Sequence, residues 1–235
     1  RAFCAGMDLS SEGNVFGLNE TLQPSRADMD QRLTEEPVQS GVRDTGGRVT
    51  LAIFNCRKPV IGAINGAAVG IGATMTLAMD VRLASEKARI GFVFGKLGIV
   101  PEACSSWFLP RIVGISQALE WVYSADILTA AEAHAGGLVR SVHAPDDLMP
   151  AARALALKFS ANRSPVAVAL ARQMLYRNAA ASHPLEAHKM DSLAMFYSSI
   201  GDGKEGVQAF LEKRDPDFRQ SASRDMPAFY SDWAK

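Results

Sequence analysis

The sequence predicts an α/β fold followed by a largely helical C-terminal part. An apolar run at residues 59–64 has the length of a strand, and Asn65-Gly66 ends it with a pair that favours a turn. A compact segment at 73–79 predicts a helix, and a second apolar run at 81–84 predicts another strand. Strand, helix and strand within about 25 residues indicate a βαβ unit with parallel strands and a right-handed crossover. Repetition of that unit gives an α/β fold.

The other elements are predicted from hydrophobic spacing and capping residues. Short strands are expected at 2–5, 88–92 and 138–142, and the polar region 10–47 is expected to be a partly helical loop. Capping residues favour a helix after Ser116 and one after a capping box at 129–132. The remaining helices are expected at 48–55, 105–112, 145–160, 164–180, 184–199 and 204–213.

The chain is predicted to have two domains. Residues 1–143 would form the α/β core, and residues 144–235 a helical subdomain. Helices in series after an α/β core commonly mediate oligomerisation, although simple cover for the core is the alternative.

Composition limits the class of partner and the compartment. The 235 residues include 25 basic and 25 acidic side chains, so neither nucleic acid nor an anionic membrane is expected as the main partner. No apolar run has the length of a transmembrane helix, and no signal peptide is expected before Ala2. The odd number of widely spaced cysteines (Cys4, Cys56 and Cys104) suits a reducing compartment, so we predict a cytoplasmic protein.

A glycine-rich stretch, residues 66–72, joins the predicted strand to the predicted helix. Such a turn presents unpaired backbone N–H groups at a helix N-terminus, which favours negative charge. A dinucleotide fingerprint fits poorly, because its third glycine would fall at Met75, and no Gly-Lys-Ser/Thr follows for a P-loop. Close packing and a site for an oxyanion or small anion are the interpretations that remain.

Glu102 is the candidate for acid–base chemistry. It lies in the apolar segment 98–103, and a carboxylate among apolar neighbours tends to have a raised pKa. A solvated loop carboxylate is the alternative. Asp8, after Gly6, is assigned to a turn or cap, and Asp80 to a structural role at a helix end.

Other catalytic patterns are not indicated. The serines at 105 and 106 lack a nucleophile elbow. No metal is predicted, because the histidines have no spacing for a metal site or a triad: His134, His143, His183 and His188.

Taken together, these segments resemble the crotonase superfamily of enoyl-CoA hydratases and isomerases. Residues 1–9 (RAFCAGMDL) are similar to the family's A-F-x-A-G-x-D-[LI] segment. Residues 58–72 (KPVIGAINGAAVGIG) are similar to its K-P-[VI]-x-A-[VI]-x-G-x-A-x-G-x-G segment. Residues 98–114 (GIVPEACSSWFLPRIVG) and 204–214 (KEGVQAFLEKR) extend the likeness over nearly the whole chain.

The resemblance implies a crotonase-like spiral of ββα units with a C-terminal helical trimerisation subdomain. The ligand would be an acyl-CoA thioester, with coenzyme A as part of the substrate and no separate cofactor, and the assembly a homotrimer or a dimer of trimers. The backbone N–H groups of Met7 and Ile71 would form an oxyanion hole, which tolerates Ile71 because only backbone is needed. The substrate-binding positions would be Ala5, Gly6, Asp8, Gly70, Gly72, Thr74 and Phe94.

The chain departs from the family's hydratases at two positions. Hydratases carry two glutamates that hold the attacking water, and these positions fall at Thr74 and Phe94. Glu102 instead matches the single base of many Δ3,Δ2-enoyl-CoA isomerases, so we expect an enzyme that shifts a double bond. An enoyl-CoA hydratase of fatty-acid β-oxidation and a non-catalytic acyl-CoA-binding member are the alternatives. The resemblance also implies that the family's first strands, several dozen residues, are not in this chain.

Overall fold

The computed structural model describes residues 2–10 and 12–234, which divide into two compact units. Unit 1 takes in the described residues of 1–54 and 61–149, and unit 2 those of 55–60 and 150–235. Arg1, which opens the first family-like segment, lies outside the described residues. The predicted domain boundary after residue 143 stays a prediction, because compactness does not establish that a segment folds independently.

Unit 1 holds the strands and the shorter helices. Three helices precede the first strand: α1 (Arg26–Gln31), α2 (Val38–Gly41) and α3 (Thr45–Phe54). The strands are β1 (Ile61–Ile64), β2 (Ala67–Val69), β3 (Val81–Ser85), β4 (Arg89–Gly91), β5 (Ile127–Thr129) and β6 (Ser141–His143). Between them lie α4 (Ile71–Thr74), α5 (Ser105–Val113), α6 (Ile115–Ser124), α7 (Ala130–Ala135) and the 3-10 helices η1 (Met75–Ala78) and η2 (Val93–Leu97).

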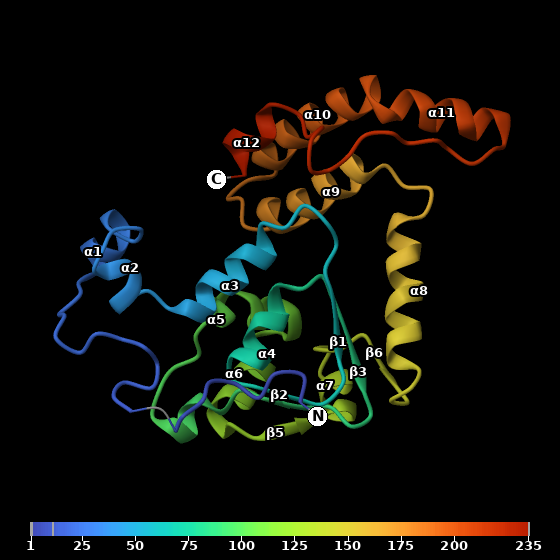
Figure 1. Cartoon of the computed structure of the whole chain (residues 1–235). Helices are drawn as coiled ribbons and strands as arrows, with labels where there is room; N and C mark the ends of the chain where they lie inside the picture. The colour runs from blue at the N-terminus through green and yellow to red at the C-terminus, as the bar shows by residue number, and fades with distance from the viewer. Residues whose placement is uncertain (1, 11, 235) are drawn as a thin grey trace. The chain divides into compact units, whose positions relative to one another are not determined.

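The described strands form two three-stranded sheets, ordered β1–β3–β6 and β2–β4–β5 (Figure 1). β1 runs parallel to β3, with Ile61 opposite Val81, and β2 runs parallel to β4, with Ala68 opposite Ile90. β6 is parallel to β3, whereas β5 is antiparallel to β4. Successive strands therefore enter different sheets before the chain turns into a helix: β1 and β2 precede α4, and β3 and β4 precede η2. This is a repeated ββα pattern.

The predicted α/β pattern is confirmed, but one turn and two strands are wrong. In place of the strand expected at 2–5 there is an isolated bridge from Cys4 to Ala68, and the strand expected at 138–142 is β6, Ser141–His143. β1, β3 and β4 coincide with three of the predicted strands, and β1 and β3 are parallel as expected. At Ala67–Val69, however, β2 replaces part of the expected turn. Its three residues are held by β4 and by a bridge to Cys4, partners that local sequence does not reveal. β5 has no counterpart in the prediction for the same reason.

Several predicted helix starts are also wrong. α3, expected from residue 48, begins at Thr45. The helix expected at 73–79 begins at Ile71 as α4 and continues as the 3-10 helix η1. α6 begins at Ile115, because Gly114, with a φ of 80°, makes the turn into it, so Ser116 is not its cap. The capping box at 129–132 is confirmed at the start of α7.

Unit 2 is helical, with its own apolar core. Its helices are α8 (Leu148–Ser160, which starts in unit 1), α9 (Pro165–Asn178), α10 (Pro184–Ile200), α11 (Asp202–Glu212) and α12 (Phe229–Trp233). All but α12 were predicted within a few residues. Val166 and Leu170 of α9 pack with Ala194 of α10 and Tyr230 of α12. None of the helices in residues 2–10 and 12–234 combines the length and apolarity that a membrane crossing needs.

Candidate active site

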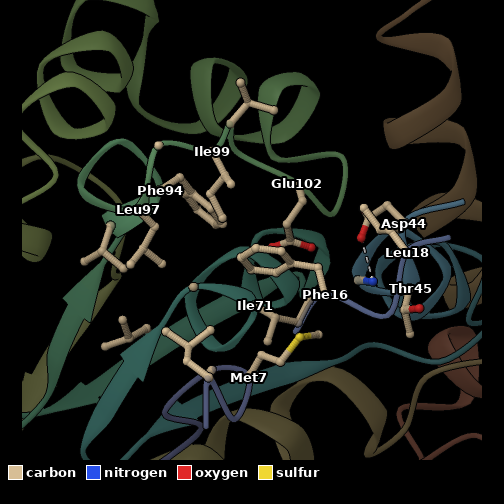
Figure 2. Close-up of a pocket in the computed structure, with 18 of the residues that line it drawn as sticks. Met7, Phe16, Leu18, Asp44, Thr45, Ile71, Phe94, Leu97, Ile99 and Glu102 are labelled. Atoms are coloured by element: carbon tan, nitrogen blue, oxygen red, sulfur yellow. Dashed lines mark hydrogen bonds between the residues drawn. The ribbon is translucent and has the colours of Figure 1, made fainter. Parts of the chain in front are cut away.

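A cavity of about 550 Å³ opens in unit 1 (Figure 2). The segments on its wall are the N-terminal segment, the start of α3, the turn into α4 and the region from η2 to Glu102. Asp44 and Glu102 are the ionisable side chains among the lining residues. The rest of the wall is mostly apolar and includes Leu9, Phe16, Leu18, Val42, Val93, Phe94, Leu97, Ile99 and Val100.

The chain between β2 and α4 runs beside the N-terminal segment. Cys4 bridges to Ala68, and the Val69 N–H donates to the Cys4 carbonyl at 3.0 Å. A Cβ on Gly72 would lie 2.0 Å from that carbonyl oxygen, so only glycine allows the approach. Gly70, with φ 56° and ψ −125°, makes the turn into α4 in a conformation that favours glycine. The glycine-rich stretch therefore brings the two segments into backbone contact.

This contact leaves two backbone N–H groups at the cavity wall. Met7 and Ile71 both line the cavity, and Figure 2 shows them below Glu102. Within the described part of the chain, neither N–H donates to a protein acceptor, and Ile71 as the first residue of α4 has no intrahelical one. α4 has four residues, so individual N–H groups rather than a macrodipole provide the positive charge. Such groups are suited to hold an oxyanion.

Glu102 points into the cavity from the loop between η2 and α5 (Figure 2). Thr74 Oγ1 donates to Glu102 Oε1 at 2.6 Å. Burial raises the pKa of Glu102 to about 7 although the Thr74 hydrogen bond opposes this, and the charge of Asp44 and a hydrogen bond to it add to the rise. At neutral pH both protonation states are therefore populated, which suits a group that takes up and returns a proton.

Asp44 is the cavity side chain that sequence reasoning missed. It lies in the uninterpreted polar region 10–47, directly before α3. Its carboxylate accepts hydrogen bonds from the N–H groups of Gly46 and Gly47, both at 2.8 Å, as an N-cap does. A signal was available, because Asp before Thr-Gly-Gly at a helix start is a cap signature, and glycines in a first turn indicate a close neighbour.

The structure brings most of the predicted site residues together. Those on the cavity wall are Ala5, Gly6, Met7, Gly70, Ile71, Phe94 and Glu102.

Three of the predicted site residues do not line the cavity. Thr74 contacts Glu102, and Gly72 packs on Cys4. Asp8 accepts hydrogen bonds from the Ser10 N–H at 3.0 Å and Ser10 Oγ at 2.7 Å, which is the turn role expected for it.

Comparison with known proteins identifies the family of the chain. The family model described as enoyl-CoA hydratase/isomerase matches residues 1–221. The chain belongs to the enoyl-CoA hydratase/isomerase family.

Individual members of the family support the assignment. The chain is 43% identical to enoyl-CoA hydratase AFT3-1 of Alternaria alternata over 222 residues, which cover 93% of this chain and 68% of that protein. It is 34% identical to a probable enoyl-CoA hydratase of Rhodobacter capsulatus, covering 93% of this chain and 77% of the other. The crystal structure of enoyl-CoA hydratase from Bacillus anthracis superposes with a TM-score of 0.69 at 32% identity, covering 81% of this chain and 74% of that one.

The chain is thus a crotonase-type enzyme of the enoyl-CoA hydratase/isomerase family with an α/β crotonase fold. The resemblance inferred from the sequence segments is confirmed. The repeated ββα pattern of unit 1 is the part of that fold that carries the cavity.

Proposed function

We propose that this protein is a Δ3,Δ2-enoyl-CoA isomerase in which Glu102 is the base and the N–H groups of Met7 and Ile71 hold the thioester oxygen. One observation carries the proposal. A carboxyl group with a pKa of about 7 shares an apolar cavity with two N–H groups that have no acceptor among the described residues. A base with a pKa near the working pH is the most effective proton carrier.

The proposed reaction moves one proton and one double bond. The Glu102 carboxylate takes a proton from C2 of a 3-enoyl thioester, and the released electron pair conjugates with the thioester, so negative charge gathers on its oxygen. Each of the two N–H donors would stabilise that charge by about 3–4 kcal/mol. Glu102 then returns the proton to C4, which gives the conjugated 2-enoyl thioester with no net change in atoms.

The proposed substrate is an acyl-CoA thioester with an apolar acyl chain. The cavity wall offers such a chain aliphatic and aromatic side chains, including Phe16, Leu18 and Phe94. Coenzyme A would enter as part of the substrate, and we propose no separate cofactor. Repositioning a double bond beside a thioester is a step in the β-oxidation of unsaturated fatty acids, which is the proposed setting.

A hydratase is the second candidate. Both relatives named above are called hydratases, and Asp44 gives the cavity a second carboxylate, as water addition by a carboxylate pair requires. However, Thr74 and Phe94 stand where the resemblance implies the two hydratase glutamates. Isomerisation needs a single base, so the residues present fit it better.

The two candidates are separated by offering the protein a 3-enoyl-CoA and, separately, a 2-enoyl-CoA while the ultraviolet absorbance of the conjugated thioester is followed. An isomerase raises the absorbance with the 3-enoyl substrate, and Glu102→Gln abolishes the rise. A fall with the 2-enoyl substrate and no rise with the 3-enoyl substrate would make the protein a hydratase.

We also propose that the helices of unit 2 assemble the chain into a homotrimer or a dimer of trimers. α10 and α11 expose apolar side chains that a second copy could cover: Met195 is 70% exposed, Phe210 82% and Leu211 73%. Light scattering after chromatography should give a trimer or hexamer mass for the native chain and a lower mass for Phe210→Asp. Tyr123→Asp, at an equally exposed site on α6 of unit 1, is the control. A native monomer would contradict the proposal.

The cytoplasm is the proposed location. Cys4, Cys56 and Cys104 are free thiols, which is typical of a reducing compartment. Cell fractionation that recovers the native protein from an organelle would contradict this.

A further inference from the structure

Asp44 connects the start of α3 to the loop that carries Glu102. Besides the N–H groups of Gly46 and Gly47, the Asp44 carboxylate accepts a hydrogen bond from the Ala103 N–H at 2.7 Å. An exposed N-cap needs only the helix donors. The third bond runs to a residue 59 positions away, directly after Glu102.

The loop held by Asp44 has an unusual backbone. Ala103 and Cys104 both have positive φ, at 58° and 57°, which is uncommon for residues other than glycine and persists where neighbours hold it. On one side, Ser105 donates its N–H and its Oγ to the Glu102 carbonyl, at 3.0 and 2.6 Å. On the other, Asp44 fixes the Ala103 N–H. Together these bonds set the direction in which the Glu102 side chain leaves the loop.

α3 also approaches the Glu102 carboxyl group directly. A Cβ on Gly46 would lie 1.8 Å from Glu102 Oε2, so the glycine leaves space for that oxygen. Oε1 is held on the opposite side by the Thr74 hydroxyl at 2.6 Å. The carboxyl group thus lies between α4 and the first turn of α3, beside Asp44.

We propose that Asp44 is a positioning residue for Glu102: Asp44 anchors the loop that carries the base, and its carboxylate accepts a hydrogen bond from the protonated carboxyl group of Glu102 between the two proton transfers. The proposal rests on the proposed function, because it assigns Asp44 a part in the work of that base. It assigns no contact between Asp44 and substrate.

The proton balance gives Asp44 a defined effect. When Glu102 has taken a proton from C2, its O–H can donate to the Asp44 carboxylate, and the bond is lost when the proton goes to C4. Burial is the main reason that the protonated form of Glu102 is favoured, and Asp44 adds to this by its charge and by this bond. The Thr74 hydroxyl favours the carboxylate instead. The result is a base strong enough to hold the proton and still able to return it.

The other ionisable groups near Glu102 do not duplicate this effect. Cys104 follows Glu102 in the loop, and burial, with the charges of Asp44 and Glu102, raises the pKa of its thiol, so it stays neutral. Arg43, next to Asp44, acts on Cys104 and favours the thiolate. Among the described residues that line the cavity, Asp44 is the other charged group.

The test compares Asp44→Asn and Asp44→Ser with the native full-length protein. Both replacements are good N-cap residues, so α3 keeps a cap while the carboxylate is lost. The readout is the titration of the Glu102 carboxyl carbon by NMR in protein labelled with 13C-glutamate, with Glu102→Gln to assign the signal. Asp28→Asn is the matched control, because the Asp28 carboxylate also accepts hydrogen bonds at a helix start, from the Ser25 N–H and Ser25 Oγ on exposed α1.

In both Asp44 variants we expect the midpoint of the Glu102 titration to fall by on the order of one pH unit, from about 7 toward the ordinary value of 4.5. In Asp28→Asn the midpoint should not change. The acid limb of kcat/KM should move with it. An unchanged midpoint in folded Asp44→Asn overturns the proposal, and so does loss of folding in both variants, which would make Asp44 purely structural. The titration needs no turnover, so a native protein without isomerase activity would refute the proposed reaction while this inference stands or falls on the midpoint.

Discussion

One side of the cavity offers backbone groups to a ligand, and the other offers side chains. On one side, the N–H groups of Met7 and Ile71 belong to the backbone, and glycines bring their segments together. On the other, Glu102 and Asp44 act through side chains: Asp44 bonds to the loop that carries Glu102, and Thr74, which does not itself line the cavity, bonds to the Glu102 carboxyl group. The backbone side depends on the space that Gly72 leaves, whereas the side-chain side depends on which groups carry protons and charge.

This difference predicts how each side responds to substitution. A backbone donor survives a change of its own side chain and is lost when the chain path moves. A carboxyl group keeps its place under a conservative change but loses its chemistry. Damage to the backbone side should therefore appear as a loss of stability together with activity, whereas damage to the side-chain side should appear in the rate and its pH dependence.

The largest effect is expected from Glu102→Gln. The amide preserves size and can still accept the Thr74 hydrogen bond, but it cannot take up a proton, so kcat for 3-enoyl-CoA isomerisation should fall by about 10²–10⁴. Acyl-CoA affinity, measured by calorimetry, should be unchanged. Glu120→Gln, on the exposed surface of α6, is the control. Turnover that survives in Glu102→Gln would remove Glu102 from the mechanism.

The next effect should come from Gly72→Ala, compared with Ile71→Ala. A methyl group on Gly72 meets the Cys4 carbonyl, so the chain must shift; unfolding free energy should drop by about 1–3 kcal/mol, and kcat by about 10²–10³ as an oxyanion donor is displaced. Ile71→Ala keeps its N–H and should retain kcat within about tenfold. Thermal unfolding and steady-state rates measure both. If kcat fell further in Ile71→Ala than in Gly72→Ala, this side of the cavity would act through the Ile71 side chain and not through its N–H group.

The pH dependence should show how the side-chain wall sets the base. Glu102 must be a carboxylate to act, and its pKa is about 7, so kcat/KM should rise as pH rises through 7. Thr74→Val removes a hydrogen bond that favours the carboxylate, so its acid limb should move to higher pH. The profile is measured with limiting 3-enoyl-CoA. A limb that stays in place, or moves down, contradicts the role given to Thr74.

The smallest expected effect is on stability. Burial holds the pKa of folded Glu102 at about 7, above its ordinary value of 4.5, so between these values the folded protein keeps a proton that the unfolded chain has released. Unfolding free energy therefore falls as pH rises through this window, by about 1–2 kcal/mol after allowance for partial exposure. Glu102→Gln has no carboxyl group to titrate, so its unfolding free energy, measured in urea at pH 5 and pH 8, should fall less between the two pH values than that of the native protein. Equal declines would contradict the raised pKa.

The sequence predicted features that depend on neighbours along the chain. The apolar run before Asn65 and the capping box at Thr129 are local signals, and both elements were found where predicted. β2 and β5 are three residues long and are held by pairing with β4, so the pattern of their own residues does not predict them.

The candidate site divides in the same way. Glu102 and the glycine-rich stretch could be singled out from their local pattern and from the resemblance. The partnership of Asp44 with Ala103 spans 59 positions and depends on tertiary contact. Asp44 is absent from the predicted site; the local pattern before α3 could have indicated a helix cap, but it contains no sign of the second partner, Ala103.

The glycine at position 46 has an evolutionary consequence. Alanine there would favour the helical backbone of α3, but its methyl group would meet Glu102 Oε2 and Ile71 Cδ1, so both flexible side chains would have to move. Positions 46 and 102 are therefore coupled by volume: a side chain at 46 is accommodated only when the Glu102 carboxyl group leaves its position beside α3. A larger residue at position 46 should therefore be selected against for as long as Glu102 serves as the base, and this constraint should end in lineages that abandon the base.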